Sequence, residues 1–157
     1  MKRILLAFLL LSLAVLPLQA AGSSPYEKGY SGNVGLSFCP GVSKGHGYEV
    51  GFETAHGYSF GNGAWLGGGV GVLLDAGSET HVIPLFFEVK YHFIDGDLSP
   101  FLSLRGGYRY WELGSSAFVS PAVGLSMGSF SAGFAYQAFS GADYFDNLLN
   151  FTVSWNF

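Results

Sequence analysis

Six charged residues occur at positions that alternate with apolar residues, and their types could support chemistry. They are Glu49, Glu53, Glu88, Lys90, Arg105 and Arg109. Carboxylates beside basic groups can form a catalytic acid–base pair or a path for protons or ions. Alternation places all six on one face of a sheet, where three negative charges balance three positive ones. Centring a turn between Ile94 and Ser99 also puts Glu88 opposite Arg105, so we expect these residues to pair with each other.

The other chemically versatile residues form no recognisable site. Gly67 to Gly71 lacks the full spacing of a dinucleotide-binding loop and opens no helix. Cys39 has no His/Asp arrangement around it, so we expect an inert thiol. The four histidines, which are scattered without metal-ligand spacing, are His46, His56, His81 and His92. The sequence therefore predicts no catalytic residue, no cofactor and no metal.

Composition points away from an ordinary soluble domain. The 157 residues are 49% hydrophobic and 17% aromatic but only 11% charged, with a mean hydropathy of +0.33. This length suits one domain, and such apolar content excludes disorder. The single cysteine excludes an internal disulfide framework and a multi-cysteine metal site. A net charge of −4 argues against a nucleic-acid partner.

The first twenty residues have the pattern of a cleavable signal peptide. Lys2 and Arg3 form a positive start, and an almost unbroken aliphatic run follows from Ile4 to Leu16. Small residues then permit cleavage after Ala20, with Ala21 as the alternative. An uncleaved transmembrane helix is disfavoured, because the apolar run is short and small residues follow it. We therefore expect a signal peptide at 1–20 and one barrel domain at 21–157.

Apolar residues recur with period two through the rest of the chain, which is typical of β-strands. The predicted strands cover 30–38, 48–53, 66–74, 83–93, 102–110, 119–127, 130–137 and 149–157. Tight connections at 61–63, 94–99 and 128–129 alternate with looser ones at 39–45, 75–80, 112–116 and 140–146. An even strand number with this alternation predicts an all-β, eight-stranded antiparallel up-and-down transmembrane β-barrel. Pro84 and Pro121 fall inside strands, where we expect a bulge or a local break.

Side chains should fill the interior of so small a barrel. The six charged residues would then form an ion-pair network in the lumen, with glycines at 51, 67, 69, 71 and 107 leaving room for the arginines. The aromatic residues should form two girdles at the lipid–water boundaries. We expect Tyr30, Phe60, Phe93, Phe130, Trp155 and Phe157 at the tight-turn end, and Phe38, Tyr48, Tyr110 and Tyr136 at the loop end.

The alternating strands and the terminal run from Phe151 to Phe157 resemble the small outer-membrane β-barrel family of OmpA/OmpX type in Gram-negative bacteria. The segments Tyr91–Phe93 and Pro100–Phe101 also look like the central hairpin of that family. The resemblance implies insertion by the barrel assembly machinery, which would recognise Phe151, Val153, Trp155 and Phe157. It also implies location in the outer membrane. Barrels that deacylate lipid A carry a His-x-Ser pair, and no histidine of this chain has serine two positions later.

The predicted function is therefore non-enzymatic. We expect a barrel that is embedded in outer-membrane lipid and whose polar lumen is filled by side chains. Its role would be structural or one of surface contact. Its outer loops would meet an unknown surface ligand through Lys44, Asp75, Glu79, Glu112, Asp143, Tyr144, Phe145 and Asp146. The first alternative is a small pore or ligand-binding barrel, in which the lumen charges line water. The second is a secreted soluble barrel of lipocalin type, whose apolar residues would point inward.

Overall fold

The computed structural model describes residues 24–42, 47–77, 80–112, 114–140 and 147–157. The predicted signal peptide, its cleavage site and much of three predicted loops lie outside these residues. Within the described ranges no helix is long and apolar enough to cross a membrane. The strands are β1 (Lys28–Pro40), β2 (Tyr48–Phe60), β3 (Ala64–Asp75), β4 (His81–His92), β5 (Leu98–Trp111), β6 (Gly114–Met127), β7 (Phe130–Ser140) and β8 (Leu148–Asn156).

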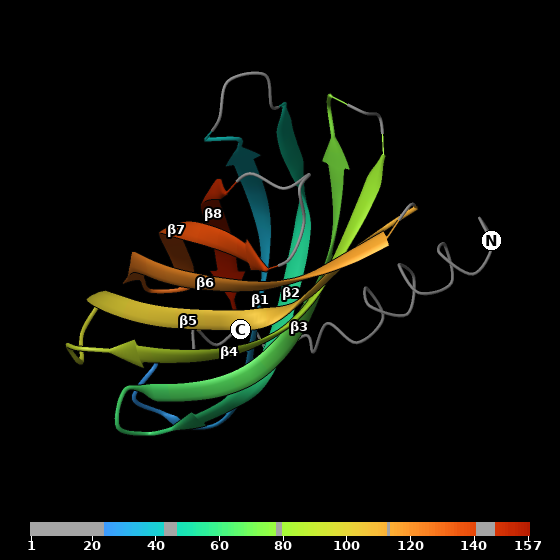
Figure 1. Cartoon of the computed structure of the whole chain (residues 1–157). Coiled ribbons are helices and arrows are strands. Elements are labelled where there is room, and N and C mark those ends of the chain that lie inside the picture. The colour runs from blue at the N-terminus through green and yellow to red at the C-terminus, as the bar shows by residue number, and fades with distance from the viewer. Residues whose placement is uncertain (1–23, 43–46, 78–79, 113, 141–146) are drawn as a thin grey trace.

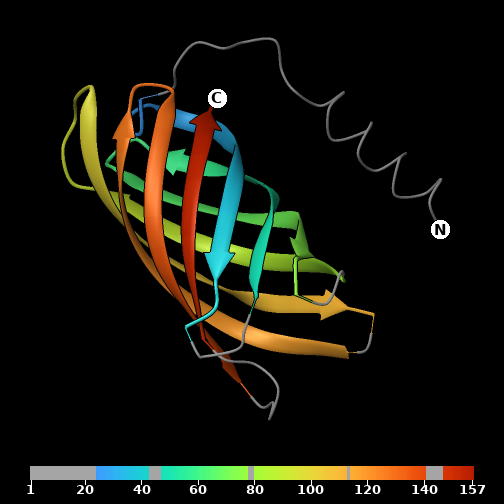
Figure 2. The same cartoon turned by 90° about the horizontal axis from the view of Figure 1, so that it is seen from above.

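These strands form one closed antiparallel barrel in the order of the chain (Figure 1). Figure 2 shows the seam, where the red β8 lies beside the blue-to-cyan β1. The seam pairs run from Asn33 with Asn156 to Phe38 with Phe151. Two backbone hydrogen bonds between Gly32 and Phe157, of 2.8 and 2.9 Å, extend the seam to the C-terminal residue. The predicted eight-stranded antiparallel barrel is confirmed.

Side chains alternate between the two faces of the barrel wall, because successive residues of a strand point to opposite sides. In β8, Phe151, Val153 and Trp155 are exposed on the outer face, whereas Asn150 and Ser154 are buried inside. The outer-face positions of the described strands hold no Asp, Glu or Arg. Their one lysine is Lys28, the first residue of β1. The wall is therefore apolar outside and polar inside, opposite to a soluble barrel.

Tight connections join the strands at one end of the barrel. Gly61, Gly63 and Gly128 have φ of +78°, +84° and +56°, a conformation that glycine adopts without steric cost. At the other end, one prediction was wrong. The looser loop expected at 112–116 is a connection of residues 112–113, because Trp111 already pairs with Gly114. Strand pairing thus continues further toward this end than the apolar alternation indicated.

The two prolines interrupt the ladder without shifting the register. Pro84 pairs with Arg109 on β5, but pairing between β3 and β4 stops at Val70–Leu85 and resumes at Leu73–Val82. Pro121 likewise pairs with Leu104 on β5 while the β6–β7 ladder is interrupted beside it. Proline has no N–H to donate, so each proline loses pairing with one of its two neighbouring strands. The local break is confirmed, and neither strand has a bulge.

Candidate functional site in the barrel lumen

The middle of the lumen is held by Arg105, which reaches two carboxylates on two other strands. Its Nη1 lies 2.9 Å from Glu53 Oε2 on β2, and its Nε lies 3.2 Å from Glu88 Oε2 on β4. The Ser37 hydroxyl donates a further hydrogen bond of 2.9 Å to Glu53 Oε2. The guanidinium also stacks on the ring of Phe86, with its Cζ 4.8 Å from the centroid. This cluster crosses the barrel and joins strands that are not neighbours.

A second cation lies toward the tight-turn end. Lys90 Nζ is 3.5 Å from Glu88 Oε1, so Glu88 contacts both this lysine and Arg105. The ammonium also lies over two rings, 5.4 Å from the centroid of Trp65 and 5.0 Å from that of Phe101. Cation–π attraction is strongest where water is excluded. Lys90 is 9% exposed, so both kinds of partner stabilise its charge.

The third cation repeats the arrangement toward the loop end. Arg109 Nη2 contacts Glu49 Oε2, and its Cζ lies 5.2 Å over the Phe139 ring. Cys39 pairs with Glu49 in the β1–β2 ladder and is fully buried, inside a strand rather than after one. The lumen is thus built in three layers, each with a cation, a carboxylate partner and an aromatic ring. All six charged residues of the predicted network face this interior.

Two of the five lumen glycines, Gly67 and Gly69, make room for aromatic rings, whereas a Cβ at Gly51 or Gly107 would meet the backbone of the neighbouring strand; none of the five has an arginine among its nearest atoms, which corrects the expected role. A Cβ on Gly67 would collide with the Trp65 ring. A Cβ on Gly69 would lie 2.5 Å from Phe86 Cζ. The rings occupy this space and present their faces to Arg105 and Lys90. The sequence could have predicted that Phe86 faces the lumen, because it lies two residues from Glu88 in the same strand.

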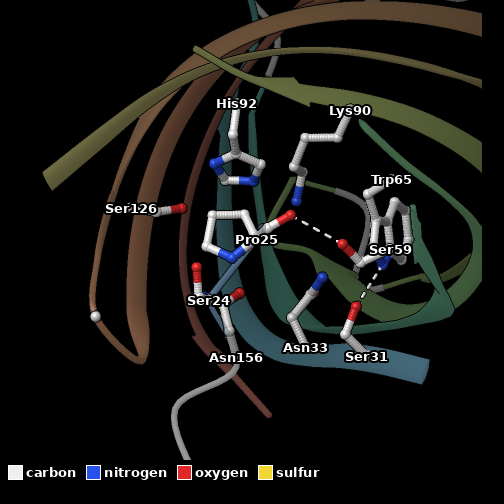
Figure 3. Close-up of a pocket in the computed structure, with 12 residues that line it drawn as sticks. Ser24, Pro25, Ser31, Asn33, Ser59, Trp65, Lys90, His92, Ser126 and Asn156 are labelled. Atoms are coloured by element: carbon white, nitrogen blue, oxygen red, sulfur yellow. Dashed lines mark hydrogen bonds between the residues drawn. The ribbon is translucent and has the colours of Figure 1, made fainter. Parts of the chain in front are cut away.

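Two small cavities remain among these layers. A cavity of about 50 Å³ lies at the tight-turn end, where Lys90, His92, Asn33 and Asn156 face it (Figure 3). A second cavity of about 30 Å³ lies beside the central ion pairs and is lined by Asn150, among others. One buried water needs about 10–15 Å³ by such a measure, so each cavity has room for only a few waters. The Nδ2 of Asn150 has no hydrogen-bond partner within the described residues, and water there would supply one.

The described histidines do not come together. His56 faces the outside of β2, His81 is exposed at the first residue of β4, and His92 lies buried at the other end of that strand. His46 lies outside the described residues. Among the described residues no group of three or more His, Cys, Asp or Glu side chains could hold a metal ion. No potential nucleophile in the three layers is paired with a histidine base.

The outer face carries one hydrogen-bonded polar chain, which the sequence reasoning missed. Thr54 Oγ1 donates to the Asn33 carbonyl at 2.9 Å and lies 3.0 Å from His56 Nε2. Since that hydroxyl hydrogen is already used, His56 Nε2–H must donate to Thr54 Oγ1. The Tyr30 hydroxyl then donates to His56 Nδ1, at 2.6 Å. The polar side-chain hydrogens of Thr54, His56 and Tyr30 therefore all have acceptors. The sequence could have placed His56 on the outer face, because it lies two residues from the outward Tyr58.

The predicted girdle residues lie on the outer face, but one of them is covered there. Phe157 is 8% exposed, and its ring packs edge-on against the outward His56 and over Gly32. The exposed girdle residues are Tyr30, Phe60, Phe93, Phe130 and Trp155 toward the turn end, with Phe38, Tyr48, Tyr110 and Tyr136 toward the loop end. Phe157 therefore lies in the space that Gly32 leaves at the seam, covered by its neighbours.

Known structures share this architecture, although neither a protein-family model nor a curated protein sequence matches the chain. Neisserial surface protein A superimposes with a TM-score of 0.61 at 14% identity, over 82% of this chain and 94% of that one. The N-terminal β-barrel domain of Pseudomonas aeruginosa OprF gives a TM-score of 0.54 at 14% identity, over 83% and 100%. A de novo designed transmembrane β-barrel gives 0.54 at 12% identity, over 81% and 95%. The likeness confirms the expected fold, that of the small eight-stranded outer-membrane barrels.

Proposed function

We propose that this protein is an integral outer-membrane barrel with a lumen closed by its own side chains, and that it has no enzymatic activity. In this proposal residues 1–20 are a signal peptide that is removed after export. Phe151, Val153, Trp155 and Phe157 serve as the signal for the barrel assembly machinery. The outer loops supply a structural or surface-contact role.

The observation that carries the membrane assignment is the composition of the outer face. Its central residues are apolar and exposed, as in Phe87, which is 76% exposed. A soluble protein rarely exposes a continuous apolar surface of this extent. The barrel is closed, so no strand edge presents unpaired backbone groups to lipid. Thr54 and His56, which interrupt the apolar face, have their hydrogens satisfied within the wall. The lipocalin-type alternative would need the reverse distribution of side chains.

The charge balance of the lumen supports closure rather than conduction. Each of the three cations has a carboxylate partner, and Glu88 joins two of the layers. An ion crossing the barrel would have to displace Lys90 from two rings and Arg105 from two carboxylates. Because these groups are shielded from water, breaking the pairs is costly. The same pairing engages these six acidic and basic side chains with one another.

Single-channel recording in planar lipid bilayers tests this proposal against the small-pore alternative. The purified, refolded protein should insert without steady conductance steps. The Glu53→Gln/Glu88→Gln variant, which leaves Arg105 without its carboxylate partners, provides a comparison in which the central layer is loosened. Steady open conductance of the unaltered protein would refute the closed lumen and favour the pore. Heat-dependent mobility of the same preparation on a detergent gel verifies that the barrel has closed.

A further inference from the structure

Residues 24–27, which precede β1, form a tight turn that we call the strap. The Glu27 N–H donates to the Ser24 carbonyl at 2.9 Å, and the Tyr26 N–H donates to Ser24 Oγ at 3.2 Å. The strap is thus internally ordered before the first strand begins. Its sequence, Ser-Pro-Tyr-Glu, has the turn-forming Ser and Pro at the start.

The strap is tied to elements far away in the chain. The Tyr26 hydroxyl donates to the His92 carbonyl at 2.9 Å, at the end of β4. Ser59 Oγ, near the end of β2, donates to the Pro25 carbonyl at 2.9 Å. The Ser24 hydroxyl lies 3.4 Å from Asp95 Oδ1 in the β4–β5 connection. These contacts hold the strap against the tight-turn end of the barrel from two sides.

The β2–β3 turn is shaped to receive the Tyr26 ring. Gly63 has φ +84°, and a Cβ there would lie 3.0 Å from Tyr26 Cζ and would collide with the His92 carbonyl. A side chain at this position would therefore push Tyr26 away from its acceptor. Gly63 serves two purposes, because the turn needs its positive φ and the strap needs the space.

The strap also forms part of the wall of the larger lumen cavity. Ser24 and Pro25 line it together with Lys90, His92 and Ser126 (Figure 3). In Figure 3 Pro25 lies near His92, with the Lys90 amine pointing toward the same space. Ser126 and His92 are each 6% exposed although they lie near the end of the barrel. Their burial at a barrel end is what a cover over the opening would produce.

We propose that the strap is a lid that covers the tight-turn end of the lumen and limits access to the cavity, which we call the chamber. This inference rests on the proposed function, because it adds a second closure to the layered ion pairs. The strap excludes solutes from the chamber, whereas the ion pairs block passage through the barrel. Release of the strap therefore exposes the chamber from one side without opening a continuous path.

The test measures whether a thiol in the chamber can be reached by a charged reagent. Ser126→Cys is introduced into a Cys39→Ser background, and the refolded protein in detergent micelles is treated with sulfonatoethyl methanethiosulfonate. With the strap in place the thiol should react slowly. Adding Tyr26→Ala and Ser59→Ala removes two of the three long-range hydrogen bonds and the ring. The reaction should then be at least about tenfold faster.

Tyr58→Ala in the same background is the matched control, because it removes an outward tyrosine at the same barrel end and should leave the rate unchanged. If the variant with both strap substitutions does not fold, Tyr26→Phe/Ser59→Ala removes the two bonds while keeping the ring. Equal labelling rates with and without these substitutions overturn the lid. A heat-dependent gel shift and bilayer recording on the same samples keep this failure separate from failure of the closed barrel. With the shift intact and conductance absent, equal rates refute the strap alone.

Discussion

Replacing Arg105 by leucine should destabilise the barrel strongly without changing its shape. The guanidinium lies within 2.9 Å of Glu53 Oε2 and 3.2 Å of Glu88 Oε2, and its side chain is only 13% exposed. Removing it leaves two carboxylates near each other in a space with little water. Breaking one side of a buried ion pair costs about 3–5 kcal/mol. Since Glu88 keeps Lys90 as a partner, we expect the lower part of that range.

The assay is urea unfolding of the protein refolded into phospholipid vesicles, followed by the folded fraction on unboiled gels. Arg105→Leu should unfold at clearly lower urea yet still insert, because the outer face is unchanged. Leu104→Ala is the matched control, as it alters the neighbouring outward side chain and no charge. Combining Arg105→Leu with Glu53→Gln should recover part of the loss, since the Glu53 carboxylate left without its cation is then neutral, while Glu88 keeps Lys90 as a partner.

Two results would refute this reasoning. One is an Arg105→Leu midpoint equal to that of Leu104→Ala, which would mean that the central ion pairs contribute nothing. The other is an Arg105→Leu/Glu53→Gln variant no more stable than Arg105→Leu, which would mean that the loss arises from missing contacts of the arginine with Phe86. The second result would still leave the layered packing intact but would assign its energy to stacking.

Three other substitutions test separate parts of the structure by the same assay. Tyr30→Phe should cost about 1 kcal/mol, because His56 Nδ1 loses its donor. Gly69→Val should prevent a heat-dependent gel shift, because its side chain would occupy the position of the Phe86 ring. Phe87→Arg should cost about 2–4 kcal/mol, because Phe87 is central in β4 and 76% exposed on the outer face.

Each of these has a control matched in chemistry. Tyr58→Phe removes a hydroxyl that is exposed at the same end and should be neutral. Gly96→Val adds a side chain where nothing lies within 4 Å and should allow normal folding. Phe93→Arg places the same charge just beyond the end of β4, where the cost of a charge at a membrane interface falls to about 0–1 kcal/mol. If a substitution and its control changed stability or folding equally, the contact or the membrane depth assigned to that residue would be wrong.

The faces of the strands were predictable, because period two is a local property of the chain. Once the turn between Ile94 and Ser99 is centred, the opposition of Glu88 and Arg105 follows from counting, and the β4–β5 ladder has this pair. The second partner of Arg105 was not predictable in this way. Glu53 lies on β2, which neither precedes nor follows β5 in the barrel. Its approach depends on closure and on which side chains fill the space between, and no count along the chain supplies either.

The contacts of the strap at the end of the barrel were likewise not predictable from the sequence. Alternation begins with β1, so residues 24–27 carry no periodic signal, and their partners lie more than thirty residues away. The position of His92 was predictable from its parity, but the hydrogen bond from Tyr26 to its carbonyl comes from a segment that is not a strand.

The inward aromatic rings explain how a lumen that contains charged side chains and a few waters can still be closed to passage. Arg105, Lys90 and Arg109 each lie over an inward aromatic ring. Gly69 makes room for Phe86, and Gly124 makes room for Phe101. A ring gives each cation a partner without adding a second charge, so three carboxylates suffice to balance the interior. Water can then occupy the gaps between layers, such as the two small cavities of about 50 and 30 Å³. Removing a ring should therefore hydrate the lumen more than removing a carboxylate. Phe86→Ala would leave a void beside the Arg105 guanidinium, whereas Glu53→Gln would keep the side-chain volume at its position.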